Sequence, residues 1–408
     1  MSNKNESNYL KHDEAGGLEI LSVPGAQFKL TTDNIDYKLH VEGHLKYLCQ
    51  PFVDRINSRL KGEKPAKVTK DGIIASTWLP PIPSNVFNRL IRAEFKTALG
   101  NYVPETVSFE ITRDCKCNCE HCVVSGGEGE IDIKKIKSTI DEALDMGCFI
   151  ITFTEGDPLL RDEIFELIDY VDKDRAIVNI FTPGTEINLD TAKRLKDAGL
   201  HNLLVSLYST EPSKHDSVRK LEGAFDSAVS AIKYGLEAGL LVTVTTHVSP
   251  SNINELDEMY KFVSDLGAHE FSLWESVPKK KGDPILSDND RKRILNFYNE
   301  INTTETGPRI FSNTYFEGQM LGCLAGQRWL HVCVDGSVKP CPYLPFHFGN
   351  IENKSLKQIW KNIRTFSEFQ GKKDRCLMHT PEFIELVDSI PTEAPIPYDF
   401  EAIKNRKD

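Results

Sequence analysis

The stretch Glu110-Ile-Thr-Arg-Asp-Cys-Lys-Cys-Asn-Cys-Glu-His-Cys122 gathers four of the chain's ten cysteines into eight residues. An apolar alternating run ends at Ile111, so we expect the cysteines on a loop that leaves a β-strand. Cys115, Cys119 and Cys122 have the spacing Cys-x3-Cys-x2-Cys, and Cys117 is an additional thiol. Three thiolates on one short loop can hold three irons of a cubane cluster and leave the fourth iron open for chemistry.

The spacing alone leaves three kinds of metal site open. A structural zinc site needs four ligands in closed tetrahedral geometry. Cys117 would have to be the fourth, although the run Cys-Lys-Cys-Asn-Cys then crowds ligands onto alternate residues. An electron-transfer cluster also needs a fourth cysteine. A cluster with three protein ligands and a substrate-binding iron needs this number and no more.

The whole chain has the composition of an ordinary globular protein. Its 408 residues are 40% hydrophobic and 27% charged, which suits roughly two to three domains or one large barrel with an appendage. The net charge of −11 argues against nucleic-acid binding, which needs a basic surface. The first residues are polar, and no apolar run approaches the ~18 residues that span a bilayer. We therefore expect a cytosolic protein.

The other cysteines fall into two sets. Disulfides are not expected, because the cytosol keeps thiols reduced. Cys49 and Cys148 stand alone and are expected to fill core space. Metal binding is the leading reason for cysteines to cluster. A late group therefore predicts a second metal site, and it comprises Cys323, Cys333, Cys341 and Cys376.

Residues 1–104 are expected to form an α+β subdomain ahead of the cysteine loop. Three prolines keep 76–84 extended, and Ser84 is a predicted helix cap. The helix expected at 85–99, which Ser84 would cap, carries an apolar stripe. The helix expected at 51–60 has Pro51 in its first turn. The subdomain is either a packing and lid element or one that recruits substrate along this stripe. The predicted elements are strands at 27–30 and 35–41 and helices at 51–60 and 85–99.

From residue 106 the chain alternates strand and helix patterns in about six units. This array predicts an α/β fold, a partial (β/α)6 TIM-like barrel over residues 105–310. Loops at the C-terminal ends of such strands carry functional sites, and the cysteine loop leaves the first strand. The predicted strands are 106–112, 149–154, 177–182, 202–207, 241–247 and 270–274. The predicted helices are 132–146, 163–171, 191–198, 224–238, 253–266 and 288–303.

Residues 311–380 are expected to form a small C-terminal domain, followed by a tail at 381–408. The run from Trp329 to Cys341 has a hairpin pattern with Asp335-Gly336 as its turn. A short helix is predicted over 356–360.

Over residues 106–275 the sequence resembles the radical S-adenosylmethionine (radical SAM) enzymes. The resemblance implies that Cys115, Cys119 and Cys122 bind a [4Fe–4S] cluster. It further implies that the methionine amino and carboxylate groups of S-adenosylmethionine chelate the open iron. His121 takes the place of the residue that touches adenine in that family. Cys117 departs from the family pattern and is expected to be a non-ligand or a neighbouring sulfur.

The turn after the second predicted strand, Thr-Glu-Gly-Asp-Pro, resembles the family's Gly-Gly-Glu-Pro turn, which holds the methionine ammonium. Glu155 replaces the first glycine, Gly156 is retained, and Asp157 replaces the glutamate. After the fourth strand, Ser206 is expected to bond the ribose or the carboxylate, and Arg219 to pair the carboxylate. For both residues a purely structural role is the alternative.

Near the same end of the barrel the chain has further pocket candidates. Tyr208 and Ser209 replace the family's usual Asp-Gly, so substrate contacts there are expected to differ. His247, Trp274 and Glu275 lie at the ends of the fifth and sixth predicted strands and should face the same mouth.

The C-terminal unit resembles the auxiliary-cluster domains of the SPASM/twitch type. The resemblance implies one [4Fe–4S] cluster held by Cys323, Cys341 and Cys376, giving two clusters in the chain. The fourth ligand is left open between Cys333, His379 and the substrate. Structural zinc is the alternative, because four nitrogen and sulfur donors also suit zinc.

Together these resemblances imply a radical SAM oxidoreductase or transferase. Such an enzyme reductively cleaves S-adenosylmethionine to a 5′-deoxyadenosyl radical, which abstracts hydrogen from an unactivated C–H bond and leads to bond formation or oxidation. We expect ferredoxin or flavodoxin as reductant. The expected substrate is a peptide or an apolar molecule such as a membrane isoprenoid lipid, which would allow a peripheral membrane contact. The alternatives are a small metabolite, a tetrapyrrole, or a non-catalytic iron–sulfur or zinc protein.

Overall fold

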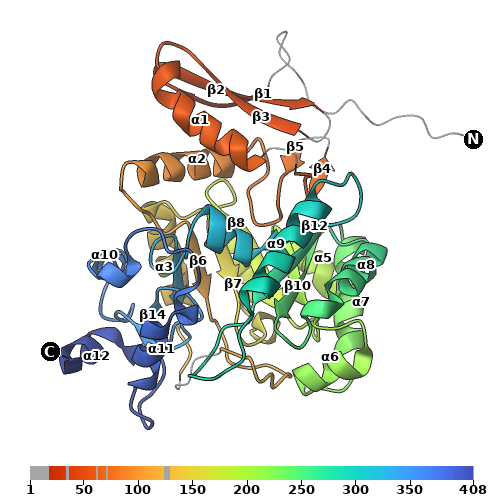
Figure 1. The fold of residues 1–408 in the computed structure, drawn as a ribbon, viewed down its shortest axis with the longest axis vertical. Helices are drawn as coiled ribbons and strands as arrows, with labels where there is room; N and C mark the ends of the chain where they lie inside the picture. The colour runs from red at the N-terminus through yellow and green to blue at the C-terminus, as the bar shows by residue number, and fades with distance from the viewer. Residues whose placement is uncertain (1–17, 34–35, 61–62, 70–71, 124–128, 408) are drawn as a thin grey trace, which may run out of the picture.

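The computed structural model describes residues 18–33, 36–60, 63–69, 72–123 and 129–407. An N-terminal α+β part lies at one end of the molecule, a mostly parallel sheet with helices around it forms the middle, and the last helices pack on one side (Figure 1). The predicted α/β fold class is confirmed. None of the described helices combines the length and apolarity that crossing a bilayer requires.

The N-terminal part begins with an antiparallel sheet and a helix. The buried side chains of Phe28, Leu39 and Val53 form their shared core. The prediction that Pro51 lies in the first turn of its helix is wrong, because the helix begins at Lys46 and the proline lies inside it. The first strand is also additional to the prediction. The elements are β1 (Leu18–Val23), β2 (Ala26–Asp33), β3 (Asp36–Glu42) and α1 (Lys46–Leu60).

Helix α2 (Asn85–Ala98) joins the N-terminal part to the barrel. Its predicted cap is confirmed, since the Ser84 hydroxyl oxygen accepts a hydrogen bond from the Phe87 amide at 3.0 Å. One side of α2 buries Phe87 and Ile91 in the N-terminal core. Val86 and Ala93 pack instead against barrel residues. Two short strands precede the helix, β4 (Lys67–Thr69) and β5 (Gly72–Ile74).

The described residues of the central sheet form nine strands in the order β12-β11-β10-β9-β8-β7-β6-β13-β14. All neighbours from β12 to β13 are parallel, whereas β14 is antiparallel to β13. The barrel strands are β6 (Thr106–Phe109), β7 (Ile150–Phe153), β8 (Ile177–Thr182), β9 (Asn202–Ser206), β10 (Leu241–Val248), β11 (Glu270–Glu275) and β12 (Arg309–Ser312). The hairpin strands are β13 (Trp329–Val332) and β14 (Val338–Lys339).

Amphipathic helices cover the outer face of this sheet, as the alternating pattern predicted. Apolar side chains of the helices and the strands form one continuous buried core. The long helices are α3 (Ile133–Met146), α4 (Ile164–Tyr170), α5 (Leu189–Asp197), α6 (Pro212–Arg219), α7 (Ala224–Glu237), α8 (Leu256–Leu266) and α9 (Asp288–Asn302). Single-turn helices are η1 (Pro158–Leu160) and η2 (Ile253–Glu255).

The C-terminal part extends the barrel sheet through β13 and β14 and then packs aromatic rings into its own core. Phe346, Phe348, Phe369 and Phe400 are buried together. A π-helix, η3 (Thr314–Met320), links β12 to this part. The remaining elements are β15 (Phe346–His347), α10 (Leu356–Ile363), η4 (Ser367–Phe369), η5 (Leu377–His379), α11 (Pro381–Asp388), β16 (Tyr398–Asp399) and α12 (Phe400–Lys407).

Candidate cofactor pocket and auxiliary cysteine site

The cysteine loop leaves β6 at the C-terminal edge of the sheet, where the sequence placed it. Backbone hydrogen bonds tie it to two neighbouring segments: the Asn118 amide donates to the Arg219 carbonyl at 3.0 Å, and the Asp157 amide donates to the Asp114 carbonyl at 2.7 Å. The thiols of Cys115 to Cys119 are half-buried and that of Cys122 is exposed. The loop is therefore held in place by the turn after β7 and by α6.

The three thiols in the middle of the loop are hydrogen-bonded to one another. The Cys117 thiol lowers the pKa of Cys115 to about 7 and that of Cys119 to about 6 by hydrogen bonding. The same contacts raise the pKa of Cys117. The thiols of Cys115, Cys117 and Cys119 therefore lie within hydrogen-bonding reach of one another, and the choice of metal ligands among them stays a prediction.

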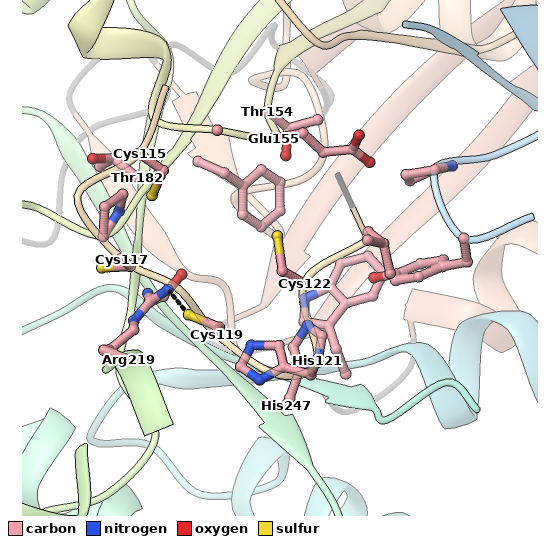
Figure 2. Close-up of a pocket in the computed structure, with 18 of the residues that line it drawn as sticks. Cys115, Cys117, Cys119, His121, Cys122, Thr154, Glu155, Thr182, Arg219 and His247 are labelled. Atoms are coloured by element: carbon pink, nitrogen blue, oxygen red, sulfur yellow. Dashed lines mark hydrogen bonds between the residues drawn. The ribbon is translucent and has the colours of Figure 1, made fainter. Parts of the chain in front are cut away.

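A cavity of about 170 Å³ lies over this loop (Figure 2). It collects most of the residues that the sequence predicted: Cys115, Cys119, His121, Cys122, Glu155, Gly156, Ser206, Arg219, His247 and Trp274. Tyr208, where the sequence led us to expect altered substrate contacts, also lines it. The sequence did not predict several further wall residues, namely Thr152, Thr154, Phe181, Thr182, Trp329 and Tyr343. Most of these residues lie at or just after the end of a barrel strand. That position is the sequence feature from which they could have been predicted.

His121 stands beside two other aromatic rings. Its Nε2 atom is 3.0 Å from the Tyr208 hydroxyl, and its ring centroid is 4.6 Å from that of His247. Burial, followed by the charge of Arg219, lowers the pKa of His121 to about 4. Burial and His121 lower the pKa of His247 to about 3. Both imidazoles are therefore neutral at physiological pH and present flat faces to a ligand.

Arg219 places a positive charge on the same cavity. One of its terminal nitrogens donates to the Cys119 sulfur at 3.5 Å, the contact drawn in Figure 2. Its guanidinium carbon lies 4.7 Å from the Tyr208 ring centroid. Within the described residues, Nε and the other terminal nitrogen are buried without a hydrogen-bond partner. A buried guanidinium with two free donors fits an anionic ligand group such as a carboxylate.

The turn after β7 forms the opposite wall. Glu155 and Gly156 both have positive φ, of 65° and 61°. A β-carbon at Gly156 would lie 2.4 Å from the Thr112 carbonyl oxygen, so only glycine fits there. The Glu155 carboxylate lies 3.3 Å from Nε2 of His331. Burial alone would raise the pKa of Glu155, but His331 and Lys339 bring it below its usual value, so the group is an anion.

Asp157 occupies a different place from the one the turn resemblance suggests. Its carboxylate accepts hydrogen bonds from the Thr182 hydroxyl at 3.0 Å and the Thr185 hydroxyl at 3.3 Å. Burial raises its pKa to about 6. Its side chain stabilises the turn, while Glu155 supplies the carboxylate that faces the cavity. A contact of Asp157 with the cofactor stays a prediction.

These donors fit the cofactors that the sequence implied. Three thiols on one loop suit a cluster with one open iron. Beside them stand a carboxylate for an ammonium, a guanidinium for a carboxylate and neutral aromatic rings for a purine. The buried donors without partners include Nδ1 of His247 and Nε1 of Trp274, in addition to those of Arg219, within the described residues.

A second cysteine site lies in the C-terminal part. Cys323 and Cys341 are buried and Cys376 is half-buried. A hydrogen bond between the thiols of Cys323 and Cys376 lowers the pKa of Cys323 to about 7 and raises that of Cys376. Burial and the charge of Cys323 raise the pKa of Cys341 to about 12. The three thiols, which come from three segments of the chain, therefore act on one another.

The two protein candidates for the fourth ligand are engaged elsewhere. Nε2 of His379 is 3.0 Å from the Ser276 carbonyl oxygen, and Nδ1 is 3.6 Å from Glu275. The sulfur of Cys333 lies within 4.8 Å of ligand atoms of Glu110 and His331. Their ligation of the auxiliary site stays a prediction.

Glu317 on η3 is an acidic neighbour of the auxiliary site that the sequence did not predict. Burial and the charge of Cys323 raise its pKa well above the usual value. A π-helix cannot be read from the sequence pattern, which explains why this residue was missed.

Comparison with known proteins agrees with this geometry. The model of the radical SAM superfamily matches residues 109–263, and that of the SPASM iron–sulfur cluster-binding domain matches residues 323–379. An AdoMet-dependent heme synthase of Nitratidesulfovibrio vulgaris is 26% identical, covering 69% of this chain and 86% of the relative. The subtilosin biosynthesis protein AlbA of Bacillus subtilis is 27% identical, covering 72% and 68%.

A solved structure shares the fold. Streptococcus suis SuiB bound to its precursor peptide SuiA covers 86% of this chain and 91% of that chain, with a TM-score of 0.56 and 15% identity.

The chain belongs to the radical SAM superfamily and has a C-terminal SPASM-type domain. It is an enzyme whose cofactors are S-adenosylmethionine and [4Fe–4S] clusters. The predicted family and cofactors are thereby confirmed, whereas the roles of individual residues stay predictions.

Proposed function

We propose that this enzyme removes a hydrogen atom from an unactivated C–H bond of its substrate and so starts bond formation or oxidation. The cavity over the cysteine loop is the observation that carries the proposal, because it joins three thiols to an anion, a cation and neutral aromatic rings. When bound, the reduced cluster and S-adenosylmethionine supply a 5′-deoxyadenosyl radical.

The chain's own residues bind and orient the cofactor in this proposal. Cys115, Cys119 and Cys122 hold the cluster. Glu155 accepts the methionine ammonium and Arg219 pairs the methionine carboxylate. Both charges are buried, so these contacts are stronger than they would be in water.

The remaining walls act on the purine and on water. His121 stacks on adenine, with the Tyr208 ring held edge-on beside the imidazole, and Ser206 bonds the ribose. Phe181, Trp274 and Trp329 close the far wall. Their apolar surface excludes water from the reacting atoms and protects a radical from side reactions.

The relatives favour a peptide as the first candidate substrate. One is a bacteriocin biosynthesis protein, and the structure with the shared fold holds a precursor peptide. The antiparallel sheet β1-β2-β3 has β1 and β3 at its edges, and an extended peptide can add to such an edge through backbone hydrogen bonds.

Reaction in the cytosol with ferredoxin or flavodoxin as reductant belongs to the same proposal.

An apolar molecule is the second candidate. The observation that favours it is an apolar cavity beside the cofactor pocket, lined by the Trp78 segment and α2. The sequence had suggested that the N-terminal subdomain either packs as a lid or recruits substrate along the apolar stripe of α2. A tetrapyrrole, as the name of the heme synthase relative suggests, is the third candidate.

Anaerobic reconstitution tests the proposed reaction. The iron-loaded protein, reduced with flavodoxin or dithionite, should form 5′-deoxyadenosine from S-adenosylmethionine, faster when a candidate substrate is present. Cys119→Ala should abolish the product, and the matched variant Cys117→Ala should retain it. If no 5′-deoxyadenosine forms with any peptide or apolar candidate, the proposal is wrong.

A further inference from the structure

The extended segment before α2 inserts Trp78 into the barrel. Its Nε1 atom donates to the Ser272 hydroxyl at 3.1 Å. Its ring centroid lies 5.7 Å from Phe181, 5.4 Å from Trp274 and 5.2 Å from Phe311. A cavity of about 210 Å³ lies beside this ring, between the N-terminal part and the barrel. None of the cluster or cofactor residues discussed above lines it except the shared Trp274 and Trp329.

Apolar side chains make most of the cavity wall. They come from four places: the segment 75–82 around Trp78, α2, residues at the start of barrel strands, and η3 with the turn after it. Cavities with such walls hold apolar ligands readily, because water finds few partners in them. The principal apolar liners are Trp78, Leu79, Ile82, Phe87, Leu90, Ile91, Phe149, Ile150, Phe311, Phe316, Met320, Leu321 and Leu324.

The cavity shares part of its wall with the cofactor pocket. Trp274 and Trp329 line both spaces, and both tryptophans are buried. Leu90 on α2 and Met320 and Leu321 by η3 are half-buried. The cavity therefore abuts the cofactor pocket at the two tryptophans, and the part of its wall formed by α2 and η3 is half-buried.

The charges on the wall exclude an anionic occupant. The described liners include four carboxyl groups, of Glu63, Glu94, Glu105 and Glu317, and one guanidinium, of Arg309. That guanidinium is already paired with Glu63 and with Glu270. Glu94 and Glu105 are likewise paired with Arg328, and burial raises the pKa of Glu317 well above its usual value, so that side chain is neutral. The charged groups that the structure describes on this wall are therefore already paired with one another, and an anion inside the cavity would find no free cation there to offset its desolvation.

We infer that this cavity binds the hydrocarbon chain of a substrate with no anionic group on the part that enters, for instance an isoprenoid chain. The chain enters at the half-buried wall formed by α2 and η3, and its other end lies beside the two tryptophans shared with the cofactor pocket. This inference rests on the proposed function and names its substrate class, an apolar chain in preference to a peptide.

Equilibrium dialysis of the holoenzyme with tritiated dodecanol and, in parallel, dodecanoate tests the inference. The two probes have the same chain length and differ in charge. Dodecanol should bind at one site, and dodecanoate at least about tenfold more weakly, because its carboxylate would have to be buried without a cation to pair it; tenfold corresponds to about 1.4 kcal/mol. Equal binding of the two probes, or no saturable binding of dodecanol, would overturn the inference.

Two variants that fill the cavity make the test specific. Ala75→Leu adds bulk inside it and Met320→Phe adds bulk at the half-buried part of its wall. Each should weaken dodecanol binding at least about tenfold. Leu99→Phe is the matched control, because Leu99 is 79% exposed at the end of α2 and should change binding by less than about twofold. If the filling variants bind like the control, dodecanol sits elsewhere and the inference fails.

Two further outcomes separate substrate class from chemistry. If N-acetyl-trileucine amide displaces dodecanol as well as unlabelled dodecanol does, the cavity takes peptide side chains and the hydrocarbon-chain inference is overturned. The formation of 5′-deoxyadenosine is measured on the same samples. Product without dodecanol binding refutes this inference alone, whereas dodecanol binding without product in any assay refutes the proposed function.

Discussion

In the cofactor pocket three cysteines come from one loop of eight residues, whereas the cysteines of the auxiliary site are drawn from residues 323–376. The first set is half-buried or exposed and lies beside the guanidinium of Arg219. The second set is mostly buried and lies near the carboxyl group of Glu317. The first site therefore pairs its thiols with a cation and an open cavity, and the second surrounds them with protein.

The difference indicates different tasks for the two sites. A cluster whose fourth iron must meet a ligand needs solvent-side access and a charge to orient that ligand. A cluster enclosed by protein, next to an acidic side chain, suits electron storage or structural support. The two sites also depend differently on folding, because the first needs one strand and its loop, while the second needs a hairpin, a π-helix and η5 to assemble.

The largest expected effect comes from breaking the first site. Cys119→Ala should remove the iron of one cluster and lower 5′-deoxyadenosine formation at least about a thousandfold, because the chemistry depends on that cluster. Cys117→Ala should keep both the iron and the activity, because the motif spacing assigns the cluster to Cys115, Cys119 and Cys122. Iron counting and product analysis on both variants check this. Loss of iron in Cys117→Ala would contradict the assignment of ligands.

A ligand substitution at the auxiliary site should also remove iron, but it should leave the cleavage of S-adenosylmethionine intact. Cys323→Ala should lose about half of the total iron, if each site holds one four-iron cluster, while the enzyme still cleaves S-adenosylmethionine without substrate. Cys333→Ala is the matched control and should retain its iron, because Cys333 lies with Glu110 and His331. Electron paramagnetic resonance and metal analysis separate the outcomes. Unchanged iron in Cys323→Ala, or zinc in the wild type, would refute an auxiliary cluster there.

The same comparison shows what the sequence could reveal. The loop cysteines, the turn with Gly156 and the βα order are contiguous patterns, so they predicted the family, the fold class and most of the pocket. Ser84 was predicted because a cap is a local hydrogen bond. Residues placed by tertiary packing carried no such signal. Trp329 reaches the pocket only because β13 pairs with β6, and Glu317 lies on a π-helix.

The errors at the N-terminus have a local cause. Proline is common in a first helical turn, so Pro51 suggested a helix start, yet α1 begins at Lys46, where the amides of Leu48 and Cys49 donate to the Leu45 carbonyl. β1 was missed because its apolar run is short. The run is a strand because it pairs with β2 across the turn at Gly25, which has a φ of 89°.

An intermediate effect is expected from Arg219, which gives the first site its charge. Arg219→Gln should weaken S-adenosylmethionine binding about tenfold to a hundredfold, since a hydrogen bond to a charged group contributes about 1.5–3 kcal/mol. Arg194→Gln, at an exposed arginine on α5, is the control. Isothermal titration of the reconstituted enzyme measures both. Equal affinities would mean that the free donors of Arg219 do not meet the carboxylate.

The smallest expected effect concerns His215, which supports the floor of the cofactor pocket. Its Nδ1 atom accepts a hydrogen bond from the Tyr208 amide at 3.1 Å, and burial lowers its pKa to about 4. A histidine with a lowered pKa stabilises the fold above its unfolded pKa of about 6.5, and this contribution is lost as the pH falls toward 4. The wild type should therefore lose about 1 kcal/mol more unfolding free energy than His215→Gln between pH 7.5 and 5.5. Glutamine can keep the hydrogen bond from Tyr208 without titrating, and exposed His44→Gln serves as the control. Urea denaturation followed by circular dichroism gives the unfolding free energy of each protein at each pH. If this free energy falls in parallel for wild type and His215→Gln, the folded protein binds a proton at His215 as readily as the unfolded chain does.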